Sequence, residues 1–229
     1  VPVKAAMQEA GAGGADHSIM GNVLSAGQGQ APARQAALKA GLDLGTQAVT
    51  LNKMCGSGLQ AVAMARQALM AGEADVVVAG GMESMSRAPF LMPTHRGGRK
   101  YGHDKMLDHM AFDGLEDAYE GLPMGVYADQ AAKDYQLTRT QQDAYALETL
   151  TRAQAATKEG RFKREIAAVE TKAGAVETDE LPRKAKPDKI PQLKPAFTDG
   201  GTVTAANASA ISDGAAALVL MRASEAEKQ

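Results

Sequence analysis

Several residue types are scarce or absent in this sequence, and each absence excludes a class of protein. Tryptophan is missing, aromatic residues make up 4% of the 229 residues, and cysteine occurs once. A single cysteine excludes an internal disulfide and a cysteine-rich zinc site, and it fits a reducing compartment. We therefore expect a cytoplasmic protein without a bound metal. No apolar run reaches the roughly 18 residues of a membrane-spanning helix, so we expect no membrane partner.

The charge balance also excludes one class of partner. The formal net charge is −2 and the isoelectric point is near 6.1, which gives no basis for nucleic-acid binding. Hydrophobic residues at 45% and charged residues at 23% are typical of a soluble globular protein. The chain is long enough to bury a core as one large domain or two smaller ones.

The first part of the chain alternates between two kinds of hydrophobic pattern. The pattern predicts helices over 3–10, 31–42 and 58–72, and strands over 18–26, 47–52 and 74–81. The last of these strands is a continuous β-branched run that should stop at a glycine pair. This alternation predicts an α/β fold with a mostly parallel sheet flanked by helices.

The composition and the hydrophobic pattern change after residue 85. The stretch 93–107 is charged and broken by glycines, which indicates a surface excursion. A helix follows over 138–160, capped by Thr138 or Thr140, and residues 170–200 indicate extended, irregular chain rich in proline. Residues 201–221 resume the small-residue α/β pattern. We therefore divide the chain into a first core half (1–85), an inserted domain (86–200) and a return to the core (201–229).

The only cysteine, Cys55, lies where a predicted strand runs into a helix. Arg66 is the only charged residue between 58 and 71, so we expect this helix to be buried on nearly all sides. The amino terminus of a helix favours an anionic sulfur, and Gly56 and Gly58 leave space for a substrate. Cysteine in an apolar stretch is also a common small core residue. The setting nevertheless favours a nucleophile.

Longer motifs point to a family. "NKMCGSGLQAV", "VVVAGGMESMSRAP", "DGLEDAY" and "GTVTAANASAISDGAAALVLM" resemble motifs of the thiolases, which comprise acetyl-CoA acetyltransferases and 3-ketoacyl-CoA thiolases. The resemblance implies a layered αβαβα fold and Cys55 as the nucleophile that takes the acyl group as a thioester. It implies that the Cys55 backbone N–H helps to form an oxyanion hole. It further implies acetyl-CoA or 3-ketoacyl-CoA and coenzyme A as substrates, no separate cofactor, and a homodimer or homotetramer.

The resemblance also implies that the inserted domain binds coenzyme A through particular residues. Those matched to the family are Ser209 and Ala205 for the pantetheine arm, Phe197 and Leu193 for the adenine and pantetheine region, Leu115 and Met124 near the acyl end, and Arg183 near the nucleotide. On residue type alone, Phe197 and Leu193 also fit a local core, and Ser209 fits a turn hydroxyl. Arg183 also fits a solvated surface charge.

Some parts of the family pattern are not found in this sequence. The family's activating histidine and second cysteine come from later motifs of the types "NEAF", "GHP" and "CxGGG", and none occurs here. The four histidines present, which we expect to be surface or loop residues, are His17, His95, His103 and His109. Family members also begin with a strand that we expect to be the central strand of the first sheet, and this chain starts after it. The chain should therefore hold the first core half without its opening strand, together with the loop domain.

These observations lead to one functional hypothesis and three alternatives. We expect an incomplete portion of an acetyl-CoA C-acetyltransferase, which performs Claisen condensation or thiolysis through an acyl-cysteine. One alternative is a longer-chain 3-ketoacyl-CoA thiolase of fatty-acid degradation. Another is a non-catalytic half-thiolase that only binds coenzyme A. A relative of the ketoacyl synthases or hydroxymethylglutaryl-CoA synthases would share the fold, but the runs "CGSGLQAV" and "GGMESMS" favour a thiolase.

Overall fold

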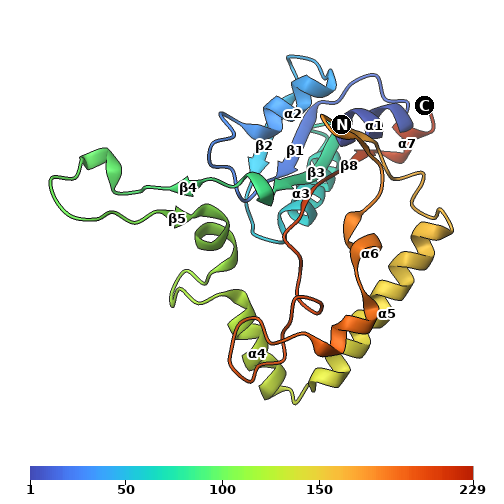
Figure 1. Ribbon diagram of the computed structural model, residues 1–229. Helices are drawn as coiled ribbons and strands as arrows, with labels where there is room; N and C mark the ends of the chain where they lie inside the picture. The colour runs from blue at the N-terminus through green and yellow to red at the C-terminus, as the bar shows by residue number, and fades with distance from the viewer. Residues whose placement is uncertain (229) are drawn as a thin grey trace. The chain divides into compact units, whose positions relative to one another are not determined.

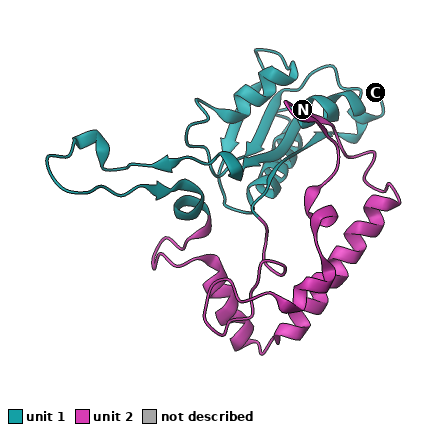
Figure 2. Ribbon diagram, viewed as in Figure 1, with its two compact units in different colours: residues 1–114, 211–229 teal, residues 115–210 magenta. Residues whose placement is uncertain are grey.

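The computed structural model describes residues 1–228 and consists of two compact units (Figures 1 and 2). The first unit comprises residues 1–114 and 211–229, and the second comprises residues 115–210. The chain thus passes between units after residues 114 and 210, whereas the sequence pattern placed its boundaries after 85 and 200. The excursion that follows Ser86 belongs to the first unit, and the Ser86 hydroxyl donates to Asp213 at 2.5 Å.

The first unit is built on a four-stranded sheet with the order β2-β1-β3-β8. Strand β1 (His17–Gly21) pairs parallel with both β2 (Gln47–Leu51) and β3 (Val76–Ser84). Strand β8 (Asp213–Met221) returns from the far end of the sequence and pairs antiparallel with β3. The expected α/β fold with a mostly parallel sheet is confirmed.

The described sheet has no gap between β1 and β3. We expected the chain to lack the family's opening strand at the centre of this sheet, and β1 pairs directly with β3 at every residue from His17 to Gly21. We also expected β3 to stop at its glycine pair, which is wrong. It continues to Ser84 because β8 pairs with it along its whole length. A side chain at Gly80 would collide with the carbonyl oxygen of Ala216, so glycine permits this close pairing.

Helices cover both faces of the sheet. The helices of the first unit are α1 (Pro2–Glu9), α2 (Pro32–Ala40), α3 (Ser57–Ala71) and the short α7 (Ala223–Ala226). Ile19 and Val77 pack in one core cluster with residues of α3, whereas Met20 and Val78 pack in another with residues of α1 and α2. Because successive side chains of a strand point to opposite faces, α3 lies on one face and α1 and α2 on the other.

Helix α3 is less buried than its composition predicts. Ala61 and Ala65 are fully buried against the sheet, but Leu59 is 77% exposed and Met70 is 70% exposed. The expectation that this helix is buried on nearly all sides is therefore wrong for the described chain. The sheet can cover only one face of a helix, and the apolar residues on the other face have no described element over them.

An exposed excursion leaves the sheet after β3. It contains two 3-10 turns, two short paired strands and a π-helical turn, which are η1 (Met85–Arg87), β4 (Phe90–Leu91), η2 (His95–Gly97), β5 (Leu107–Asp108) and η3 (Ala111–Leu115). Residues 92–100 are all exposed, and Tyr101 is 97% exposed. The predicted surface excursion is thus confirmed. No helix within residues 1–228 is long and apolar enough to cross a membrane.

Helices make up most of the regular secondary structure of the second unit. Its elements are α4 (Met124–Asp134), α5 (Arg139–Lys158), the hairpin of β6 (Val169–Thr171) and β7 (Gly174–Val176), α6 (Glu180–Lys184) and η4 (Pro187–Gln192). The cap of α5 is Thr138, whose hydroxyl accepts from the Gln141 backbone N–H while the Gln141 side chain accepts from the Thr138 N–H. This capping box resolves the choice between Thr138 and Thr140.

Candidate functional site

Cys55 lies in a tight turn between β2 and α3. The Asn52 side chain accepts from the Met54 N–H at 2.9 Å, and Met54 has a left-handed φ of 49°. The Ser57 hydroxyl accepts from the Lys53 N–H at 2.8 Å and donates to the Met54 carbonyl at 2.6 Å. These short bonds fix the turn on both sides of Cys55 and set the direction in which its side chain leaves the backbone.

The same turn places Cys55 directly before the helix terminus. Gly56 is the N-cap residue of α3, so Cys55 is one residue outside the cap, and its side chain is exposed. No side chain caps this terminus, which leaves the first N–H groups of a 15-residue helix without a side-chain partner. A negative charge near these groups is stabilised by the helix dipole. This is the strand–turn–helix setting that the sequence predicted.

A close approach between β1 and α3 holds the helix terminus in place. A Cβ atom at Gly21 would lie 2.6 Å from the Cβ of Ser57, so only glycine fits at this position of the strand. Gly81 of β3 lies in the same layer, and a Cβ there would come within 3.7 Å of the Gly58 Cα. Glycines in the two central strands therefore let the first turn of α3 rest directly on the sheet.

A carboxylate and an amide at the carboxyl edge of the sheet were missed by sequence reasoning. Glu83 accepts hydrogen bonds from the backbone N–H groups of Val23 and Leu24, at 2.8 and 3.1 Å. It also accepts from the Asn22 side-chain amide at 2.9 Å, and that amide donates to the Met82 carbonyl as well. These bonds fix the loop after β1. Asn22 follows β1 and Glu83 lies near the end of β3. The two residues are 61 positions apart in the sequence and meet only because β1 and β3 pair.

His109 corrects another expectation. It is only 5% exposed, although we expected a surface or loop residue. Its Nδ1 lies 2.5 Å from an Asp113 carboxylate oxygen, and its Nε2 accepts from the Ala26 N–H at 3.3 Å. His109 therefore ties the loop after β1 to the end of the excursion. His17 is likewise not a loop residue, since it lies half-buried in β1, whereas His95 and His103 are exposed as expected.

Among the residues expected to contact coenzyme A, Met124 and Phe197 lie close together in the second unit. Met124 is the first residue of α4, and the Phe197 ring lies directly on the next residue, Gly125, where any side chain would collide with it. Both Met124 and Phe197 are partly exposed, so their apolar surfaces are accessible. Leu115 ends the π-helical turn η3 and is 38% exposed.

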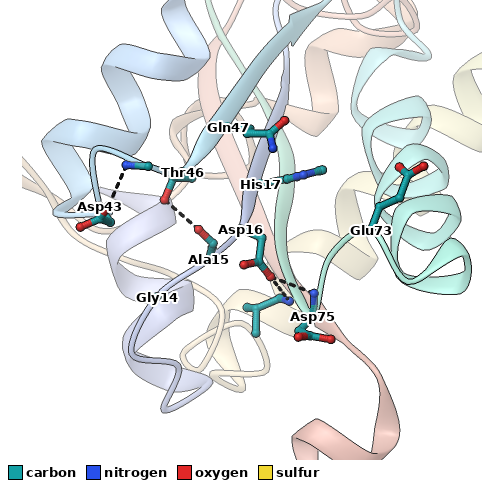
Figure 3. A pocket seen from close by; sticks show the side chains of 11 residues that line it. Gly14, Ala15, Asp16, His17, Asp43, Thr46, Gln47, Glu73 and Asp75 are labelled. Atoms are coloured by element: carbon teal, nitrogen blue, oxygen red, sulfur yellow. Dashed lines mark hydrogen bonds between the residues drawn. The ribbon is translucent and has the colours of Figure 1, made fainter.

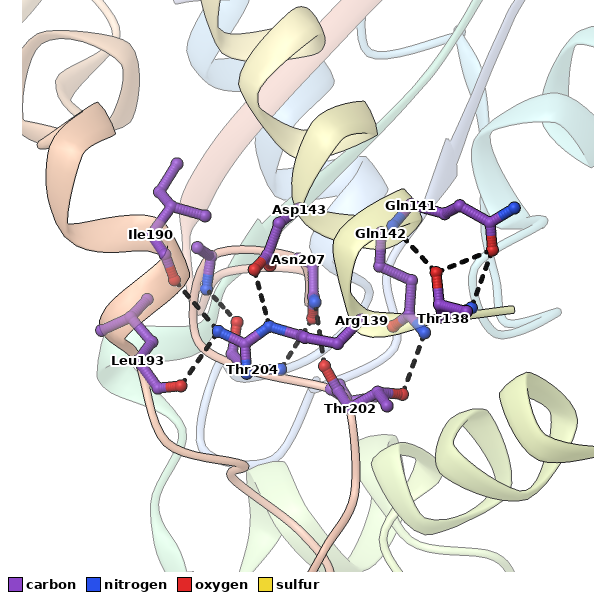
Figure 4. Close-up of polar contacts among 12 residues, drawn as sticks. Thr138, Arg139, Gln141, Gln142, Asp143, Ile190, Leu193, Thr202, Thr204 and Asn207 are labelled. Atoms are coloured by element: carbon purple, nitrogen blue, oxygen red, sulfur yellow. Dashed lines mark hydrogen bonds and ion pairs between the residues drawn. The ribbon is translucent and has the colours of Figure 1, made fainter. Parts of the chain in front are cut away.

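Leu193 is held by a partly buried arginine. The Arg139 guanidinium donates through Nη2 to the Ile190 and Leu193 carbonyl oxygens, at 3.0 and 2.9 Å, and through Nε to Asp143 at 2.7 Å (Figure 4). Asp143 is buried in α5, and its second carboxylate oxygen has no hydrogen-bond partner. The planar guanidinium thus fixes the backbone of η4 against α5.

Ala205 and Ser209 lie on the loop that leads back to β8. Both residues are exposed, while the neighbouring Thr204 is fully buried. The Asn207 side chain accepts from the Thr204 N–H at 2.7 Å and donates to the Thr202 carbonyl at 3.0 Å, which closes this loop on itself (Figure 4). The remaining candidate, Arg183, is an exposed residue of the short helix α6.

A shallow pocket of about 510 Å³ lies elsewhere in the first unit (Figure 3). Its lining includes Asp16, Asp43, Glu73 and Asp75, at the amino ends of the parallel strands, so it is at the opposite edge of the sheet from Cys55. The Asp16 carboxylate accepts from the Val76 and Asp75 N–H groups, and these bonds hold its pKa below the usual value. None of the candidate residues lines this pocket.

Comparison with known proteins identifies the family. Residues 3–224 match the N-terminal domain of thiolase. The chain is 49% identical to an acetyl-CoA acetyltransferase of Cupriavidus necator, with 100% of this chain and 60% of that protein covered. It is also 49% identical to an acetyl-CoA acetyltransferase of Pseudomonas aeruginosa, with 94% of this chain and 56% of that protein covered.

A solved structure agrees with these matches. The crystal structure of Acat5 thiolase from Ascaris suum in complex with coenzyme A superposes with a TM-score of 0.92 at 42% identity, covering 99% of this chain and 59% of that one. The chain belongs to the thiolase family, and it spans about 60% of the length of the curated relatives it matches. Its fold is that of the thiolase N-terminal domain.

Proposed function

We propose that the complete protein is an acetyl-CoA C-acetyltransferase in which Cys55 is the acyl-accepting nucleophile. The observation that carries this proposal is the exposed Cys55 thiol directly before the uncapped amino terminus of α3. The names of the relatives at 49% identity support the choice of the acetyl group and of coenzyme A as the acyl carrier.

The proposed chemistry is acyl transfer through a covalent intermediate. The Cys55 thiolate adds to the thioester carbonyl of acetyl-CoA, and the tetrahedral intermediate then expels the coenzyme A thiolate and leaves an acetyl-cysteine. The proposal assigns stabilisation of the developing oxyanion to the Cys55 backbone N–H and to the positive end of the α3 dipole. The second half of the reaction requires a further acid–base group, which the family supplies from motifs that this sequence does not contain.

The proposal assigns coenzyme A binding to the second unit. The accessible apolar surfaces of Met124 and Phe197 suit the pantetheine chain, and the exposed Ser209 hydroxyl suits one of its amide groups. Arg183 and the adjacent Lys184 are cations for the nucleotide phosphates. The Ascaris relative was solved with coenzyme A, which supports coenzyme A as the ligand.

A direct experiment tests the nucleophile. The complete protein is incubated with acetyl-CoA, digested and examined by mass spectrometry, and we expect one acetyl group on the Cys55 peptide. Cys55→Ser should abolish this label, because an unactivated hydroxyl does not attack the thioester at a comparable rate. Acetylation of another residue in place of Cys55 would refute the assignment, and unlabelled wild-type protein that still binds coenzyme A would favour the non-catalytic alternative.

Chain length, assembly and compartment belong to the same proposal. We expect faster turnover of acetoacetyl-CoA than of a long-chain 3-ketoacyl-CoA, and the reverse order would support the fatty-acid-degrading alternative. We also propose a homodimer or homotetramer, which sedimentation of the complete protein would test. A cytoplasmic location is supported by the single cysteine of the sequence, and fluorescence microscopy of the tagged complete protein would test it.

A further inference from the structure

Asp129, in the middle of α4, accepts three hydrogen bonds from one turn of the second unit. Its Oδ2 accepts from the Thr198 hydroxyl at 2.6 Å. Its Oδ1 accepts from the backbone N–H groups of Thr202 and Val203, at 2.8 and 2.9 Å. A side chain at Gly201 would collide with the Asp129 carboxylate, so the turn is shaped around this group.

The environment of Asp129 favours the charged form. Partial burial acts to raise its pKa, but the hydrogen bonds from Thr198, Val203 and Thr202 outweigh burial and hold the pKa below its usual value. Asp129 is therefore an anion at neutral pH. Hydrogen bonds to a charged acceptor are shorter and stronger than those between neutral groups. The carboxylate thus closes both ends of the 198–203 turn.

The 198–203 turn connects the residues expected to bind coenzyme A. Phe197 directly precedes it, and Ala205 and Ser209 follow it on the loop that Thr204 and Asn207 close. The Ala196 N–H donates to the Val203 carbonyl at 2.9 Å, which brings the two ends of the turn together. The helix that carries Asp129 also begins with Met124.

We propose that Asp129 is a positioning residue for coenzyme A, which holds the segment around Phe197, Ala205 and Ser209 in its binding conformation against α4. This inference rests on the proposed function. Asp129 itself need not touch the ligand. Its role is to restrict the conformations of this segment before binding, so that the binding of coenzyme A does not have to supply the free energy for ordering it.

Removal of the carboxylate leaves two backbone N–H groups and one hydroxyl without their acceptor. The turn will then sample conformations in which these groups reach water, and coenzyme A must reverse that change on binding. We expect Asp129→Ala in the complete protein to raise KM for coenzyme A in thiolysis about tenfold. The kcat at saturating coenzyme A should stay within about twofold, because saturation restores the binding conformation.

A conservative variant and a matched control separate positioning from general damage. Asp129→Asn keeps an oxygen for the Thr202 and Val203 N–H groups but loses the charge, and its amide must donate to the Thr198 hydroxyl oxygen, so KM should lie between the wild-type and Asp129→Ala values. Asp134→Ala removes another carboxylate of α4, which accepts from the Gln130 side chain at 2.7 Å, and should leave KM unchanged. Thr198→Val removes one of the three bonds and should raise KM less than Asp129→Ala, which provides a test even if Asp129→Ala does not fold.

A second substrate distinguishes failure of this inference from failure of the proposed function. Acetylation of Cys55 by a short acetyl thioester without the nucleotide should be unchanged in Asp129→Ala. Equal losses with acetyl-CoA and the short thioester, or a KM for coenzyme A equal to that of wild type, would overturn the positioning role. If neither thioester acetylates Cys55 of the wild-type protein, the proposed function is overturned instead, whatever the variants show.

Discussion

The contact between Gly21 and α3 allows a quantitative test of how the Cys55 turn is held. A Cβ atom at residue 21 would lie 2.6 Å from the Ser57 Cβ, 2.9 Å from the Ser57 carbonyl carbon and 3.0 Å from the Gly58 nitrogen. Comfortable separations of carbon atoms are about 3.5–4.0 Å. Relief of the contact in Gly21→Ala therefore requires the first turn of α3 to move by about 1 Å, because no rotatable side chain can absorb it.

This displacement should affect both stability and reactivity. Overpacking of this kind reduces the free energy of unfolding by about 1–3 kcal/mol. A displacement of about 1 Å at a reacting group can slow its reaction by as much as about 100-fold. We therefore expect acetylation of Cys55 by acetyl-CoA to slow by about 10- to 100-fold in Gly21→Ala, with urea unfolding of the complete protein reporting the loss of stability.

Gly214→Ala is the matched control for this experiment. Gly214 lies in β8 of the same sheet, and a Cβ there would meet no atom within 4 Å. We expect its unfolding free energy to stay within about 0.5 kcal/mol of wild type, with an unchanged rate of Cys55 acetylation. If Gly21→Ala behaved in the same way as this control, the reasoning that the sheet positions the Cys55 turn through Gly21 would be refuted.

Three further predictions concern polar groups. Arg139→Ala deprives the buried Asp143 carboxylate of its ion-pair partner, and we expect it to reduce the free energy of unfolding by about 3 kcal/mol in urea titrations. Asp16 has a lowered pKa in the folded state, so its contribution to stability is present above the ordinary value of 3.8 and is lost as the pH falls through the lower folded value. In urea titrations over a pH series, the advantage of wild type over Asp16→Asn should shrink as the pH falls below 3.8. Thr138→Ala removes the cap of α5 and should cost about 1 kcal/mol by the same measurement.

Each of these predictions has its own control. Arg152→Ala removes an ion pair whose arginine is 78% exposed, and should change stability by less than about 1 kcal/mol. If Arg139→Ala and Arg152→Ala reduced the free energy of unfolding equally, burial of Asp143 would not account for the strength of its ion pair. Thr140→Ala should reduce the free energy of unfolding less than Thr138→Ala does. A larger loss in Thr140→Ala would show that Thr138 is not the cap of α5. A wild-type advantage over Asp16→Asn that persists unchanged at low pH would show that the backbone bonds to Asp16 do not depend on its charge.

Local patterns were sufficient to predict most elements of the first unit. Helices ended where the sequence indicated because Gly41 and Gly72 adopt left-handed φ values of 93° and 73°, which other residues adopt only with strain. The strand–turn–helix setting of Cys55 was likewise readable, since it depends on residues adjacent in the chain. The sequence also predicted the surface excursion and limited the cap of α5 to Thr138 or Thr140, because each depends on a single short segment.

The pairings between distant segments were decided by the tertiary structure alone. The direct contact of β1 with β3, the extension of β3 along β8 and the single buried face of α3 depend on which surfaces meet, and a one-dimensional pattern does not contain that information. The burial of His109 was missed for the same reason, since its partner Ala26 is 83 residues away. Asp129 gave no signal in the sequence either, because its importance comes from three donors that reach it only after the chain has folded back on α4.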